Sequence, residues 1–128
     1  MIQFYKDRNL EEGTKVKVYY NLHTYLFSII AMEGEYKGKV VAHGNNILIQ
    51  DEIKFHINKA GQEKARKIRQ RNVHAYVVGT FKGIEQKKLE KRGYYNPYTT
   101  DTFIDSDTKE TLNKVNQVIF ADKHMTYI

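Results

Sequence analysis

A chain of 128 residues favours one domain with one hydrophobic core. With 41% apolar and 28% charged residues the composition is that of an ordinary globular protein, and no apolar run approaches the ~18 residues of a membrane span. Cysteine is absent and the first residues show no signal-peptide pattern, so we expect no disulfide or thiolate chemistry and a cytoplasmic location.

The net charge of +6 is concentrated in one segment of the chain. Residues 1–58 carry seven Lys or Arg and seven Asp or Glu, whereas residues 59–81 carry six cations and one acid. Residues 82–128 are nearly balanced, with eight cations and seven acids. The excess charge is therefore a local patch, which points to an anionic partner for that patch and not to a generally basic protein.

Strand patterns dominate the first part of the chain. Valine and lysine alternate in residues 15–20, which predicts a half-buried strand, and the more continuously apolar residues 26–32 predict a central strand. Turns rich in glycine and asparagine then separate further apolar runs. These runs predict strands at residues 39–43, 47–50 and 53–57, the last two being split by Asp51 and Glu52.

The hydrophobic period changes at Asn58, which is a favourable helix N-cap. Residues 58–70 are therefore expected to form the longest helix. Its apolar arc contains Ala60, Ala65 and Ile68, and Ala65 and Ile68 are expected in the core. Gly61 lies on the same arc and, although it costs roughly 1 kcal/mol relative to alanine, it lets the helix pack closely on the sheet.

The rest of the chain is mostly strand-like again. Asn72 is expected to end the helix, and residues 73–81 form the clearest strand, with an internal position in the sheet. A short helix is expected around residues 85–91. Strands follow at residues 102–104, 115–121 and 124–128. The whole pattern predicts a single α+β domain over residues 1–128, with one principal helix packed on a mostly antiparallel sheet whose closure into a small barrel is left open.

Six cations in and after the expected helix are the candidate polyanion-binding residues. They are Lys59, Lys64, Arg66, Lys67, Arg69 and Arg71. On a helical wheel Arg66 points away from the core with Gln62 on the same exposed side, and Glu63 is the single acid of the segment. Like charges three or four positions apart repel, so a phosphate-rich ligand would relieve this face. The alternative is a solvated helix end, where cations interact favourably with the helix dipole.

Three tyrosines around the only proline form a second candidate site. Tyr94, Tyr95 and Tyr98 lie in the sequence YYNPY, where Asn-Pro sets an extended or turn geometry. Their rings are candidates for stacking on nucleobases, each contributing roughly 1–3 kcal/mol. The alternative is that Tyr94 or Tyr98 folds back on the sheet and anchors a long loop. Stacking is favoured if this loop lies beside the basic helix.

We assign no catalytic residue, cofactor or metal site from the sequence pattern. No two of the five histidines have the spacing of a helical metal pair, and no cysteine completes a zinc site. An enzyme remains the alternative: a metal-dependent nuclease or other phosphoryl-transfer enzyme that uses His56, His74 and an acid from Asp101–Glu110. That acidic run fits a polar hairpin turn better, because it lacks the glycine of calcium loops.

Four further segments have a distinctive order and spacing. They are VYYNLHTYLFSI, GKVVAHG, RNVHAYVVG and YYNPYTTDTF, and the resemblance that they carry covers the chain from about Lys15 to about Val118. Together they resemble a group of small uncharacterised proteins carried by phages, plasmids and other mobile elements. The resemblance transfers no catalytic residues. It implies a bacterial cytoplasm and an accessory gene, a context in which nucleic-acid-binding proteins and inhibitors of host defence, including anti-CRISPR proteins, are frequent.

The leading hypothesis from the sequence is a non-enzymatic binding protein whose basic helix engages a phosphate-rich partner. That partner is nucleic acid or the nucleic-acid channel of a ribonucleoprotein, such as a host defence complex. No membrane partner is expected. A third class, a protein–protein adaptor that is homodimeric through an exposed strand edge, stays open as well.

Overall fold

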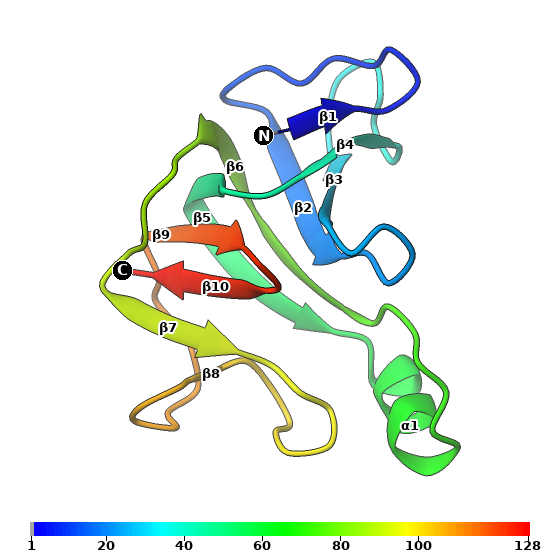
Figure 1. Ribbon diagram of the computed structural model, residues 1–128, viewed down its shortest axis with the longest axis vertical. Coiled ribbons are helices and arrows are strands. Elements are labelled where there is room, and N and C mark those ends of the chain that lie inside the picture. The colour runs from blue at the N-terminus through cyan, green and yellow to red at the C-terminus, as the bar shows by residue number, and fades with distance from the viewer. Residues whose placement is uncertain (1) are drawn as a thin grey trace.

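The computed structural model describes residues 2–128, which form one sheet and one helix. The strands are β1 (Ile2–Phe4), β2 (Lys15–Tyr20), β3 (Phe27–Ala31), β4 (Val40–Gly44), β5 (Ile47–Ile57), β6 (Ala75–Ile84), β7 (Lys91–Tyr94), β8 (Ile104–Asp105), β9 (Gln117–Ala121) and β10 (His124–Tyr127). The helix α1 (Lys59–Lys67) connects β5 to β6. The strands lie in the order β1-β4-β3-β2-β6-β5-β9-β10-β7-β8, and all neighbours pair antiparallel (Figure 1).

The α+β class and the mostly antiparallel sheet are confirmed. The sheet is not closed into a barrel, because β1 and β8 stand at the two ends of the strand order. It is nevertheless strongly curled (Figure 1). The rings of Phe27 on β3 and Phe120 on β9 lie 5.1 Å apart, although β2, β6 and β5 separate these strands in the sheet. The curl therefore brings the two halves of the sheet into contact.

The hydrophobic core is built from alternate residues of the central strands. Val16 and Val18 on β2 and Ile47 and Ile49 on β5 are almost fully buried, because side chains two positions apart share one face of a sheet. The wholly buried side chains also include Ile29, Val41 and Val118. Both halves of the strand order thus contribute to one core.

Residues 47–50 and 53–57 belong to one strand, β5, and not to two. Asp51 and Glu52 have φ angles of 57° and 53°, and the pairing with β6 shifts its register between Gln50 and Lys54. This irregularity is a β-bulge, which bends a strand and increases its twist. The first part of β5 pairs with both β6 and β9, whereas the part after the bulge pairs with β6 alone and leads to α1.

The strand β6 lies between β2 and β5, which confirms the internal position expected for residues 73–81. It begins at Ala75, and the preceding Val73 is exposed. The helix expected around residues 85–91 is wrong. This polar segment offers no apolar face for a helix to bury, and it forms a loop that leads into β7. The strand β1 was not expected either.

The start of α1 follows the sequence prediction. The Asn58 side chain accepts a hydrogen bond of 3.1 Å from the Gly61 backbone N–H, so Asn58 is the N-cap. Ala65 is buried as expected. The helix lies at the end of β5, at a corner of the molecule (Figure 1). Within residues 2–128 no helix has both the length and the apolar character that crossing a membrane requires.

The end of α1 differs from the prediction. The helix stops at Lys67, well before Asn72, and Ile68 is its C-cap. Arg69 then has a φ of 55°, so the chain leaves the helical path at this residue. As a result Ile68 is 62% exposed, and the expectation that it is buried in the core is wrong.

Candidate nucleic-acid interface

The segment 94–101, which we call the tyrosine loop, lies directly against α1. Arg66 on α1 donates hydrogen bonds to the backbone carbonyls of Pro97 and Thr100, the latter at 2.8 Å. Its guanidinium also forms an ion pair of 2.8 Å with the carboxylate of Asp101. Arg66 was expected to point freely into solvent. Instead it joins the helix to the loop, because the tyrosine loop covers that side of α1.

Gln62 shows the same correction more strongly. It was expected on the exposed side of the helix, but only 4% of its surface is exposed. Its Nε2 donates to the Tyr95 hydroxyl at 3.1 Å and to the Asp101 carbonyl at 3.0 Å. A buried amide without partners would cost ~1–3 kcal/mol, and the loop supplies these partners.

Tyr95 connects the loop to both the helix and the sheet. Its hydroxyl lies 2.7 Å from Nε2 of His74, the residue before β6, and its ring packs 5.3 Å from that of Phe103. Nδ1 of His74 faces the carbonyl and side-chain oxygens of Asn72, which are acceptors. Nδ1 therefore carries the proton, and Tyr95 donates to Nε2 while accepting from Gln62. Burial raises the pKa of Tyr95. These contacts fix the position of the Tyr95 side chain between the helix and the sheet.

The contacts of Gln62, Arg66 and Tyr95 form a joint between α1 and the tyrosine loop, and five of the six candidate cations remain exposed beside it. We call them the basic face: Lys59, Lys64, Lys67, Arg69 and Arg71. No acid lies in the first turn of α1, and Glu63 is the acid within the helix. The nearby Asp101 is paired with Arg66, whose hydrogen bond lowers the pKa of that carboxyl. Asp101, the acid in the loop, therefore pairs with Arg66 and does not neutralise the basic face.

The two remaining tyrosines of the loop differ in accessibility. Tyr98 is 51% exposed, and the Arg69 guanidinium lies 5.6 Å from the centre of its ring. Tyr94 is half-buried, with the Lys109 ammonium 5.5 Å from its ring centre. Tyr98 therefore adjoins the basic face directly. It is the loop tyrosine best placed for stacking on a ligand held by these cations.

The residues of the enzyme alternative are engaged in structural contacts. The Asp105 carboxylate accepts backbone hydrogen bonds from Asp107 and Thr108 and a bond of 2.5 Å from the Tyr127 hydroxyl. The Tyr127 bond lowers the pKa of Asp105 to about 2. This carboxylate thus closes the polar turn that the sequence indicated. His56 is exposed and stacks on Tyr76 at 5.0 Å, and residues 2–128 contain no cluster of three side chains suited to hold a metal ion.

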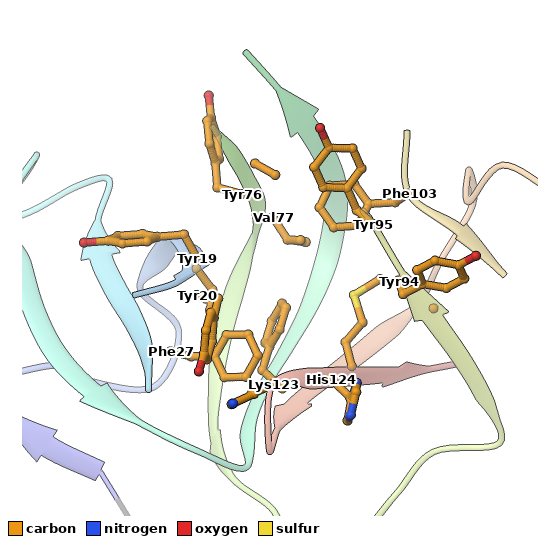
Figure 2. Close-up of a pocket in the computed structure, with 15 residues that line it drawn as sticks. Tyr19, Tyr20, Phe27, Tyr76, Val77, Tyr94, Tyr95, Phe103, Lys123 and His124 are labelled. Atoms are coloured by element: carbon orange, nitrogen blue, oxygen red, sulfur yellow. The ribbon is translucent and has the colours of Figure 1, made fainter. Parts of the chain in front are cut away.

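An aromatic cleft opens inside the curl of the sheet, and the sequence did not reveal it. Its volume is about 160 Å³. Tyr20 and Phe27 line one side, Tyr95 and Phe103 line the other, and Val77 on β6 lies between them (Figure 2). These residues come from β2, β3, β6 and the segment between β7 and β8. No single motif unites them, because only the curl of the sheet places them together.

The fold and its surface define a small antiparallel-sheet protein with a basic corner and an aromatic cleft. The chain belongs to the family of the Mycobacterium phage L5 gene 82 protein, whose family model matches residues 9–128. It is similar to the gene 82 protein of Mycobacterium phage L5, with 31% identity over 115 residues that cover 84% of this chain and 90% of that protein. No solved structure matches the chain. The predicted resemblance to small phage proteins is confirmed.

Two histidines should make the stability of this protein depend on pH. Burial lowers the pKa of His74 and of His43 below the ordinary value of 6.5, and Arg66 adds to the effect at His74. Below that value the unfolded chain binds protons that the folded chain does not. The contribution of these histidines to the free energy of unfolding is therefore fully present above about pH 6.5. It falls as the pH drops toward the lowered pKa values of the folded state.

Urea unfolding between about pH 8 and pH 5 measures this dependence. We expect a smaller pH slope in the variants His74→Gln and His43→Gln. The variant His56→Gln is the control, since this exposed side chain stacks on Tyr76 at the surface. An unchanged pH slope in both His74→Gln and His43→Gln would contradict the assignment.

Proposed function

We propose that this protein binds nucleic acid, with the basic face of α1 on the phosphate backbone and Tyr98 beside it as a stacking platform. The observation that carries the proposal is the joint between α1 and the tyrosine loop. Arg66 holds the loop against the helix through Thr100 and Asp101, which places Tyr98 next to Arg69. Cations along a groove with an accessible aromatic ring are the general means of holding a nucleic-acid strand.

The electrostatics of the corner support an anionic ligand. Repulsion among five neighbouring cations destabilises the free protein slightly, and a bound phosphate backbone removes that repulsion. Glu63 and Asp101 are the acids closest in the chain to the basic face and the loop, and Asp101 is already paired with Arg66. The field at the corner is thus positive, and it attracts a polyanion before any specific contact forms.

A salt titration of binding tests this function. If each cation of the basic face neutralises one phosphate, log K against log salt has a slope of up to about −3.5 for a single strand and about −4.5 for duplex DNA. Fluorescence anisotropy with labelled oligonucleotides between about 50 and 200 mM salt measures the slope. No binding at the low-salt end, or binding that ignores salt, would overturn the proposal.

Membership in a phage family supports a particular partner, which is nucleic acid held in a host ribonucleoprotein such as a defence complex. In this version the protein inhibits by occupying nucleic acid or the surface that binds it. Affinity capture from a bacterial lysate distinguishes the versions. A partner lost on nuclease treatment indicates binding to nucleic acid, and a retained ribonucleoprotein with no affinity for free oligonucleotides indicates a protein surface.

A further inference from the structure

The sheet carries aromatic and basic side chains on the face that points away from the core. The buried Val18 lies between Lys17 and Tyr19 on β2, and side chains alternate along a strand, so these two lie on the opposite face. Tyr76 on β6 lies on the same face as Lys17 and Tyr19. Figure 2 shows the side chains of Tyr19 and Tyr76 pointing away from that of Tyr20.

A groove lies between Tyr19 and Tyr76 on this face, and we call it the outer groove. Its volume is about 360 Å³, and Lys17, Ile30 and Val73 are among the residues that line it. Ile30 and the exposed Val73 give it apolar surface beside the two rings. Within residues 2–128 no Asp or Glu lines the groove. The outer groove therefore combines aromatic walls with a cation and has no acid to repel a phosphate.

An aromatic stack positions the cation of the outer groove. The Lys17 ammonium lies 4.7 Å from the centre of the Tyr76 ring, and the exposed His56 ring stacks on Tyr76 at 5.0 Å. Lys17 on β2 and His56 on β5 come from the strands on either side of β6, so they cover the two faces of Tyr76. Tyr19 is half-buried and forms the other wall. It is therefore the ring of the groove that is available to a ligand.

A second lysine lies on the same face of the sheet. Lys17 on β2 and Lys54 on β5 both pair in register with Val78 on β6, so the three side chains form one row across the sheet. Lys54 is exposed, whereas Val78 is buried between the two lysines. The positive charge thus extends across three strands beside the groove.

The outer groove adjoins the basic face of α1. Val73 lines the groove and follows Arg71 by two residues, and on the other side Lys59 follows His56 by three. An extended chain spans at most about 3.6 Å per residue, so the Cα atoms of each pair lie within about 7 Å and about 11 Å of each other. A nucleic-acid strand on the basic face therefore passes directly into the groove.

We propose that the outer groove is a base-stacking subsite for single-stranded nucleic acid, with the Tyr19 ring against one base and the Lys17 ammonium against the adjoining phosphate. This assignment rests on the proposed function and gives it a substrate class, which is unpaired strands. Sheets that present aromatic rings and cations on an open face hold single strands in this way. Every base has a π-face, so the subsite tolerates any sequence. A duplex reaches only the basic face, because its bases are already stacked.

The variants Tyr19→Ala and Tyr19→Phe separate the ring from its hydroxyl. By fluorescence anisotropy Tyr19→Ala should bind single-stranded oligonucleotides about tenfold more weakly, because it loses the stacking ring. Its salt slope should be unchanged, since no phosphate contact is removed. Tyr19→Phe should bind like the native protein, and both variants should bind duplex DNA as before. Lys17→Gln should instead reduce the salt slope for single strands by about 0.7.

The variant Tyr5→Ala is the matched control. Lys6 and Arg8 lie 5.3 and 5.4 Å from the centre of the Tyr5 ring, so the same exchange is made beside cations at another place. Tyr5 follows β1, which β4 and β3 separate from β2 in the sheet. Single-strand affinity should therefore be unchanged in Tyr5→Ala. Circular-dichroism melts verify that each variant is folded.

Photocrosslinking of the native protein locates the base without any substitution. Oligonucleotides that contain 5-iodouracil crosslink on irradiation to aromatic side chains stacked on that base, and mass spectrometry of the peptides identifies the residue. We expect crosslinks at Tyr19 and at Tyr98, and none at Tyr5.

The outcomes separate the two proposals. Salt-dependent binding with crosslinks at Tyr98 and none at Tyr19 overturns the groove assignment and leaves the proposed function standing. Crosslinks at Tyr19 alone, with a salt slope that Lys64→Glu and Lys67→Glu leave unchanged, overturn the role of the basic face and leave the groove as the binding site. Equal losses of single-strand and duplex affinity in Tyr19→Ala, or the same loss in Tyr19→Phe, overturn the stacking assignment.

Discussion

The triple variant Lys64→Glu, Lys67→Glu, Arg71→Glu is expected to bind nucleic acid at least a hundredfold more weakly than the native protein. At about 0.1 M salt each phosphate contact contributes roughly a factor of ten through counterion release, and the new carboxylates add repulsion. The salt slope should fall by about two to three units in the same titration. All three side chains are exposed, so no core contact is lost. Arg66 is left in place because it holds the tyrosine loop.

A matched control has the same change in net charge at another place on the surface. Lys6, Lys37 and Lys39 are exposed and belong to the segments around β1 and β4, at the opposite end of the molecule from α1 (Figure 1). Replacing these three by glutamate should weaken binding much less. Circular-dichroism melts of both variants exclude unfolding as the cause, since surface substitutions change stability by about 0.5 kcal/mol or less each. Equal losses of affinity in the two variants would show that binding depends on the net charge of the protein and not on the basic face.

The variant Gly61→Ala is expected to destabilise the protein by about 1–2 kcal/mol. In an isolated helix this exchange stabilises by roughly 1 kcal/mol. Here an added Cβ would lie 2.5 Å from Cβ of His74 and 2.9 Å from the side-chain oxygen of Asn72. Neither the helix nor the start of β6 can yield without breaking the bond between His74 and Tyr95, and overpacking of this kind costs about 1–3 kcal/mol. The packing cost therefore exceeds the gain in helix propensity.

Urea unfolding of Gly61→Ala and Ala60→Gly measures the two effects separately. Ala60 is exposed, so its exchange for glycine should cost only the propensity difference of roughly 1 kcal/mol. Gly61→Ala should also weaken oligonucleotide binding, because it separates α1 from the tyrosine loop. A stability gain in Gly61→Ala would mean that the helix does not pack closely against the segment before β6.

The role of Arg66 changes the meaning of the basic run. The sequence alone suggests a uniform cationic surface. In the structure, however, Arg66 binds one carboxylate and two backbone carbonyls of the tyrosine loop. The site is thus a rigid corner in which Gln62, Arg66 and Tyr95 supply the structure, while the basic face and Tyr98 supply the accessible groups.

The sequence by itself determined the features that depend on neighbouring residues. The alternation in residues 15–20 and the N-cap Asn58 correspond to β2 and to the start of α1, because local hydrogen bonds and side-chain periodicity decide them. The internal strand at residues 73–81 could be predicted from its run of apolar residues. The local charge excess and the resemblance to phage proteins were also visible, since both are properties of composition and order.

Only the tertiary structure decided which side of α1 is covered. The wheel placed Gln62 and Arg66 in solvent and Ile68 in the core, whereas the tyrosine loop buries Gln62 and the turn at Arg69 exposes Ile68. The aromatic cleft likewise exists only because a curled sheet brings Phe27 within 5.1 Å of Phe120. Contacts between segments so distant in the chain leave no periodic trace in the sequence. Their positions follow from how the whole sheet twists and bends, and no single segment records that.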